Sequence, residues 1–153
     1  MHNIDSAESL PSNFACNLNS LGVIKLEGEQ ATSYLQGQVT ANVESLTEDQ
    51  YALGCHCDFK GKTWNVFYVF GSATELYLLC HKESIPASLA ELKKYGVFSK
   101  VEIIDDSDNW TVWGGAGESI NGLSNELLGG SPSDKAQLLS SDKGFALHLS
   151  MPQ

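Results

Sequence analysis

The chain has 153 residues, of which 42% are hydrophobic and 18% charged, a composition typical of one folded domain with a hydrophobic core and not of a disordered chain. Its net charge of −10 disfavours sequence-independent binding to phosphates, so direct nucleic-acid binding is not expected. No apolar run approaches the roughly 20 residues that cross a bilayer, and the first residues do not resemble a secretory signal, which predicts a cytoplasmic protein without a membrane anchor.

The lysines are concentrated in the middle of the sequence. Residues 60–100 carry six lysines and three acids, whereas residues 1–59 carry one lysine and eight acids, and residues 101–153 two lysines and eight acids. The sequence contains no arginine, so the bidentate fork usually favoured for tight phosphate recognition is missing. The lysines can attract an anionic small ligand as point charges, or they can simply keep the surface soluble.

The first predicted elements are a strand and a short helix. The residues GVIKLEG, at 22–28, predict a partly buried strand that ends at a glycine. A helix is expected over EQATSYLQ, at 29–36, with Glu29 in its first turn and Gly37 at its end. Three residues on one face carry the helical spacing: Ala31, Tyr34 and Leu35.

A β-hairpin is predicted in the middle of the chain. The residues YALGCHCDF, at 51–59, and TWNVFYVF, at 63–70, are rich in aromatic and β-branched residues and flank the turn KGK. The apolar run LYLLCH, at 76–81, predicts a third antiparallel strand. These three segments favour a sheet built from sequential strands.

Further elements follow along the second half of the chain. Ser84 is a good helix N-cap, and Pro86 fits the first turn. The helix that they begin carries an apolar stripe formed by Ile85, Leu89 and Leu92, which continues toward Tyr95. Strands are expected within 98–106 and 110–115, and a helix that ends in a glycine pair over 118–130.

The order of these elements predicts the fold class. Strands outnumber helices and do not alternate with them regularly, which favours an α+β fold with a mainly antiparallel sheet and flanking helices. We expect an irregular segment over residues 1–21 and one domain over residues 22–153.

The four cysteines allow a metal hypothesis, which the spacing supports only weakly. They are Cys16, Cys55, Cys57 and Cys80. In a strand, Cys55 and Cys57 would share one face while His56 points away, so a compact zinc site would need Cys80 from a neighbouring strand. The favoured interpretation is that of reduced cysteines without a metal, because free cysteine commonly behaves as a small core residue.

The residues GQVTAN, at 37–42, combine small and amide-bearing side chains directly after the predicted helix. Their backbone and amide groups could bind a heteroaromatic ring by paired hydrogen bonds. The alternative is a helix-capping loop that needs these amides for itself.

Three blocks of sequence resemble the YgfZ family. They are YLQGQVTANV at 34–43, EDQYALGCHCDFKGKTW at 48–64 and LKKYGVFSKVEI at 92–103, and they occur in the family's order with similar spacing. The resemblance implies a folate-binding fold related to the glycine cleavage T-protein, and a role in tRNA modification connected with iron–sulfur enzymes. The family's second signature, of the K-G-C-x-G-Q-E kind, is absent from the sequence, which predicts an incomplete domain.

The resemblance also suggests which residues would bind folate, because the ligand combines an amide-seeking pterin with anionic carboxylates. The candidates are Tyr34, Gln36, Gln38, Thr40, Asn42, Lys60 and Lys62. Leu21 stands where family members can place an aromatic residue against the ligand, so that contact is not carried over.

An accessory role is favoured over catalysis. T-proteins have acidic residues in the strand after the glycine turn, whereas the corresponding residues here include Trp64 and Asn65 and no carboxylate. Asp58 is more simply explained as the start of a turn. The alternatives are an aminomethyltransferase-like enzyme and a protein-interaction module for a tRNA-modifying enzyme.

Overall fold

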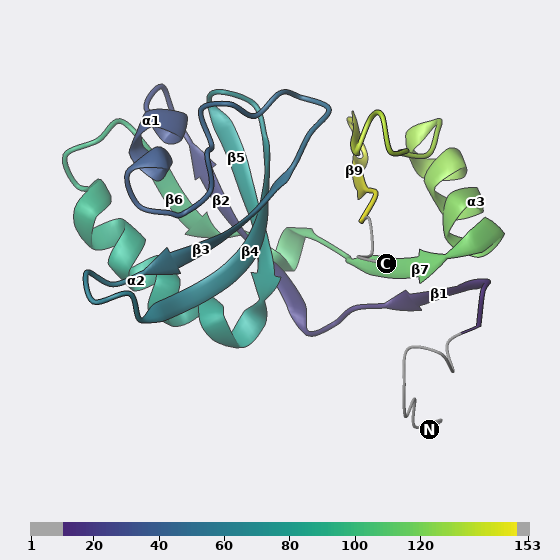
Figure 1. Cartoon of the computed structure of the whole chain (residues 1–153), viewed down its shortest axis with the longest axis horizontal. Helices are drawn as coiled ribbons and strands as arrows, with labels where there is room; N and C mark the ends of the chain where they lie inside the picture. Colours follow the sequence, from purple (N-terminus) through teal and green to yellow (C-terminus); the bar gives the residue numbers. More distant parts are fainter. Residues whose placement is uncertain (1–10, 150–153) are drawn as a thin grey trace.

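The structure is a computed structural model that describes residues 11–149, which form two lobes (Figure 1). The larger lobe contains a five-stranded sheet in the order β3-β4-β5-β2-β6, in which each pair of neighbours is antiparallel. Its strands are β2 (Leu21–Glu27), β3 (Ala52–Cys57), β4 (Thr63–Gly71), β5 (Glu75–His81) and β6 (Glu102–Asp105). The expected α+β fold with a mainly antiparallel sheet is confirmed, and so are the hairpin and its third strand.

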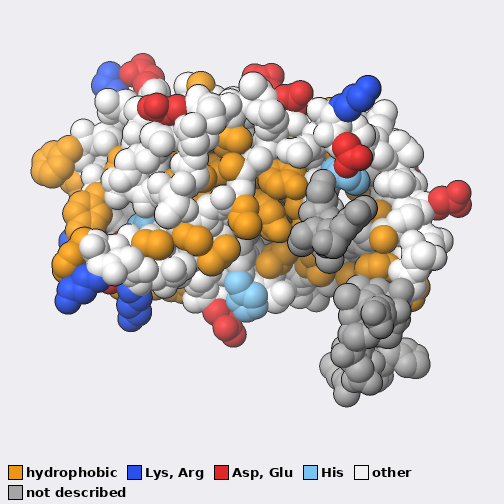
Figure 2. Space-filling view, in the orientation of Figure 1, with side chains coloured by type: hydrophobic (Ala, Val, Ile, Leu, Met, Phe, Trp, Pro, Cys, Tyr) orange, Lys and Arg blue, Asp and Glu red, His pale blue; other side chains and the backbone are white. Residues whose placement is uncertain are grey.

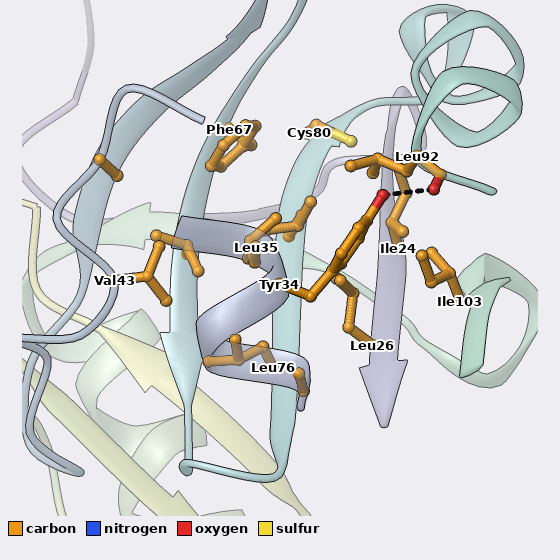
Figure 3. Packing of buried hydrophobic residues seen from close by; sticks show 14 of the residues in the cluster. Ile24, Leu26, Tyr34, Leu35, Val43, Phe67, Leu76, Cys80, Leu92 and Ile103 are labelled. Atoms are coloured by element: carbon orange, nitrogen blue, oxygen red, sulfur yellow. Dashed lines mark hydrogen bonds between the residues drawn. The ribbon is translucent and has the colours of Figure 1, made fainter. Parts of the chain in front are cut away.

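Two helices cover one face of this sheet, which we call the inner face. They are α1 (Ala31–Gln36) and α2 (Ile85–Gly96). Figure 3 shows Tyr34 and Leu35 of α1 pointing toward the strands, with Leu92 of α2 beside them. Leu35 and Leu92 are fully buried, and each such side chain contributes about 1.5–3 kcal/mol of transfer free energy.

The smaller lobe packs against the opposite, outer face of the sheet. It consists of β1 (Phe14–Asn17), β7 (Trp113–Ala116), α3 (Gly117–Leu128), β8 (Leu138–Ser141) and β9 (Gly144–Leu147). The ring of Phe145 lies 5.0 Å from the rings of both Phe70 and Tyr77, and the ring of Trp110 lies 5.3 Å from that of Tyr77. These aromatic contacts hold the smaller lobe on the sheet.

The helices lie close to their predicted positions but begin differently. Glu29 lies outside α1, whose N-cap residue is Gln30, while Gly37 follows its end as expected. Ser84 precedes α2 without capping it by a side-chain hydrogen bond. Its hydroxyl instead donates to Oδ1 of Asn65 and the carbonyl of His81, both at 2.7 Å. The Ser84 hydroxyl therefore binds the buried Asn65 side chain and does not cap α2 as expected.

Other elements differ from the sequence-based expectations. The segment 1–21 was expected to be irregular, yet it contains β1, which pairs with β7, and the first residue of β2. Residues 1–10 lie outside the described residues. The β8–β9 hairpin was not predicted. Its two strands pair with each other, and its side chains pack against the outer face of the five-stranded sheet. Within residues 11–149, no helix is long and apolar enough to span a membrane.

Candidate ligand-binding site

The segment after α1 is held in place by its own side chains. Oε1 of Gln36 accepts hydrogen bonds from the backbone N–H groups of Val43, at 2.7 Å, and Glu44, at 3.1 Å. The hydroxyl of Tyr34 donates to the carbonyl of Leu92 at 2.5 Å, and burial raises the pKa of Tyr34 to about 12. Both side chains therefore stabilise the fold, as expected for a helix-capping loop that uses its own polar groups.

The same segment then runs along the edge of β3. Val39 forms an antiparallel bridge with His56, the N–H of Thr40 donates to the carbonyl of Cys55 at 3.0 Å, and the N–H of Cys55 donates to Oγ1 of Thr40 at 2.9 Å. Because the bridge is antiparallel, Gln38, which precedes Val39, lies on the side of the bridge toward Cys57, where β3 ends. The segment thus carries Gln38 toward the turn that follows β3.

That turn presents two lysines. Oδ1 of Asp58 accepts hydrogen bonds from the backbone N–H groups of Lys60 and Lys62, both at 2.8 Å, which confirms the interpretation of Asp58 as a turn residue. Gly61 completes the turn with a φ of 81°, a conformation that favours glycine. Nζ of Lys62 lies 5.7 Å from the ring centroid of Trp64. Neither lysine forms an ion pair with a carboxylate of residues 11–149, so both charges remain available to an anion.

The structure therefore divides the seven predicted binding residues into two groups. Gln38, Lys60 and Lys62 lie at the same end of β3, together with Trp64, and we call these four residues the β3-end site. The other four predicted residues are not part of the β3-end site. Tyr34 is buried in the core, and the side chains of Gln36 and Thr40 accept hydrogen bonds from backbone N–H groups. Asn42 is exposed, and its carbonyl accepts a hydrogen bond from the hydroxyl of Ser45 at 3.0 Å.

The cysteines do not gather as the metal hypothesis requires. Cys80 is buried on the inner face, whereas Cys55 pairs with Val66 and lies on the outer face. An irregularity between His56 and Cys57 interrupts the alternation that would have put Cys57 on the face of Cys55. Residues 11–149 contain no group of three His, Cys, Asp or Glu side chains placed to hold a metal ion.

A buried polar cluster lies between the sheet and α2, and sequence reasoning had not assigned it. Nδ1 of His56 is 2.9 Å from Oγ of Ser88, and Oδ1 of Asn65 accepts from Ser84. Nδ2 of Asn65 is buried without a hydrogen-bond partner among the described residues. Burial lowers the pKa of His56 and raises that of Cys80. The alternation of side chains along β3 and β4 places His56 and Asn65 on the inner face. This alternation was the sequence signal that could have indicated their burial.

Two cavities open elsewhere on the surface. One of about 240 Å³ lies between the sheet and β8, with Glu75, Tyr77 and Phe145 among its lining residues. In it, Lys25 and the Tyr77 hydroxyl hold the pKa of Glu75 below its ordinary value. The other, of about 350 Å³, lies between the end of α2 and β6. Neither of these two cavities is lined by any of the seven predicted binding residues.

Comparison of the fold with solved structures defines the class of protein. The crystal structure of the glycine cleavage system aminomethyltransferase T from Bartonella henselae matches 78% of this chain with a TM-score of 0.65 and 13% sequence identity, over 36% of its own length. Most of this chain thus shares the fold of part of a T-protein. At this identity the likeness concerns the fold alone.

Sequence comparison identifies the relatives more narrowly. The tRNA-modifying protein YgfZ of Vibrio vulnificus (strain CMCP6) is 48% identical over 100 residues, which are 65% of this chain and 31% of that protein. The YgfZ protein of Yersinia pseudotuberculosis serotype IB (strain PB1/+) is 34% identical over 136 residues, which are 89% of this chain and 41% of the relative. No family model matches the chain. The resemblance to YgfZ is thereby confirmed, and the chain is homologous to about a third of the length of these relatives.

Proposed function

We propose that this chain binds folate, as tetrahydrofolate or a derivative, and that the β3-end site forms one wall of the binding surface. The observation that carries the proposal is the antiparallel bridge between Val39 and His56, which brings Gln38 toward the lysine-bearing turn. The ammonium groups of Lys60 and Lys62 suit the carboxylates of the glutamate tail. The amide of Gln38 offers a donor and an acceptor to the pterin, and the Trp64 ring offers a stacking surface.

The proposed role is that of an accessory or regulatory protein in tRNA modification, linked to the maintenance of iron–sulfur enzymes in the cytoplasm. The YgfZ relatives are tRNA-modifying proteins by name, which supports the connection with tRNA modification. The net charge of −10 favours contact with the modifying enzymes over direct contact with tRNA. An accessory role is favoured over an aminomethyltransferase because β4, with the sequence TWNVFYVFG, carries no carboxylate.

Anaerobic titration with tetrahydrofolate, followed by tryptophan fluorescence, tests folate binding directly. The double variant K60A/K62A should bind at least about ten-fold more weakly, since it removes two charged contacts. The matched control is K135A/K143A, which removes two lysines outside the site. A folded protein without any fluorescence response, or equal affinity of the two double variants, would contradict the proposal.

The two alternatives are separated by function assays. A glycine-cleavage assay with the partner proteins supplied should show no turnover, and measurable turnover would favour the aminomethyltransferase alternative. Capture of a purified tRNA-modifying enzyme without folate, and equally by K60A/K62A, would favour an interaction module.

A further inference from the structure

The outer face of the sheet is only partly covered by the smaller lobe. Next to the covered part, β3 and β4 present four side chains that we call the outer patch: Leu53, Cys55, Val66 and Tyr68. Leu53 and Val66 are 61% and 53% exposed although they stand in the middle of regular strands. Figure 2 shows hydrophobic side chains gathered between the two lobes. Exposed apolar side chains in the interior of a sheet commonly mark an interaction surface.

The outer patch continues an interface that already exists in the molecule. The ring of Tyr68 meets that of Tyr51 edge to face at 5.5 Å between centroids, and the hydroxyl of Tyr51 donates to the carbonyl of His148 at 2.9 Å. Tyr51 and the neighbouring Leu79 also pack against the aromatic cluster around Phe70. A polypeptide bound to the outer patch would therefore lie beside the smaller lobe on the outer face of the sheet.

The YgfZ relatives are much longer than the part that this chain matches. The chain matches only 31% of the Vibrio vulnificus relative and 41% of the Yersinia pseudotuberculosis relative, so more than half of each relative lies outside the match. We propose that the outer patch is the docking surface for an apolar face of that remaining YgfZ-type polypeptide. This interaction is independent of the proposed folate binding, because neither the outer patch nor its interface includes the lysines of the β3-end site.

The proposal is tested by placing a charge on the outer patch in two settings. In the 153-residue protein, Val66→Glu should lower the unfolding temperature by about 2 °C or less, because the side chain is largely exposed. In the intact Yersinia pseudotuberculosis relative, glutamate at the aligned position should lower it by about 5 °C or more, because a charge would be buried in an apolar contact. The matched control, glutamate at Val97 and its aligned position, should change little in either protein.

A second readout does not depend on a variant that could fail to fold. A cysteine introduced by Leu53→Cys should react rapidly with a maleimide in the 153-residue protein, and the aligned cysteine in the intact relative at least about ten-fold more slowly. The proposal would be overturned by equal labelling rates in the two proteins, together with an unchanged unfolding temperature when glutamate replaces the residue aligned with Val66 in the relative. It would also be overturned if sedimentation showed a dimer of the 153-residue protein that Val66→Glu dissociates, because the occupant would then be a second copy.

Discussion

His56 and Ser88 join β3 to α2 through a buried contact of 2.9 Å between Nδ1 and Oγ. Burial lowers the pKa of His56, and the charge of Glu91 opposes this shift without reversing it. The unfolded chain consequently binds a proton at a higher pH than the folded protein does. The contribution of His56 to stability is therefore complete above its ordinary pKa of about 6.5 and is lost as the pH falls through the lower pKa of the folded protein.

The first prediction concerns this pH dependence. Replacing His56 by glutamine keeps a polar partner for Ser88 and removes the titration, so the free energy of unfolding of H56Q should fall less on acidification than that of the unaltered protein. Urea unfolding at about pH 7.5 and about pH 5.5 measures the difference. His81→Gln is the matched control, because His81 is exposed. An equal fall in H56Q and the unaltered protein would show that His56 does not carry the effect.

The second prediction assigns Tyr34 to the fold. Tyr34→Phe removes the donor to the Leu92 carbonyl and should lower the free energy of unfolding by about 1 kcal/mol. Tyr95→Phe, at an exposed tyrosine, should leave it unchanged. Chemical unfolding measures both. Loss of folate binding by Y34F without any loss of stability would instead place the hydroxyl in the binding site.

The third prediction separates the two glutamines of the loop. Gln36→Ala removes the acceptor of two backbone N–H groups and should lower the free energy of unfolding by about 1 kcal/mol, with faster hydrogen exchange at Val43 and Glu44. Gln38→Ala should leave stability unchanged and weaken tetrahydrofolate binding. Hydrogen exchange and fluorescence titration of both variants test this division, which fails if Q38A loosens the loop as Q36A does.

The fourth prediction concerns the attachment of the smaller lobe. Phe145→Ala removes the ring that contacts Phe70, Tyr77 and Trp110, and it should lower the free energy of unfolding by about 3 kcal/mol. Phe98→Ala is the control, since Phe98 is 97% exposed. Thermal unfolding gives the comparison. Equal stability of F145A and F98A would mean that the two lobes are held together by other contacts.

The fold of the larger lobe could be predicted from its sequence because local signals agree with the final structure. Aromatic and β-branched residues on both sides of the KGK turn predict the hairpin, and the Asp58 side chain closes that turn as its position suggests. The smaller lobe was harder to predict. The hairpin containing Phe145 has four-residue strands with serines and a glycine, and its position depends on aromatic residues that are distant in sequence.

The candidate site was predictable only in part. The pattern from Tyr34 to Asn42 indicates polar groups after a helix, but it does not specify which of them the backbone will use. That depends on the register between Val39 and His56, which are 17 positions apart in the sequence, and on the loop shape that Gln36 fixes. Similarly, Ser84 stands at the position of an N-cap, yet its hydroxyl donates a hydrogen bond to the buried Asn65. The sequence does not reveal this alternative partner, because it is brought close only by the folding of β4 against α2.

The bridge between Val39 and His56 also has a consequence for solubility. Val39 and Thr40 form hydrogen bonds with backbone groups of β3, the strand at one edge of the sheet. Without these bonds, those groups could pair with a strand from another molecule. The opposite border is β6, which has only four residues and carries a charged residue at each end, Glu102 and Asp105. Both borders are thus poor templates for aggregation, so the molecule can leave the apolar face of its hairpin uncovered without offering strand edges to other chains.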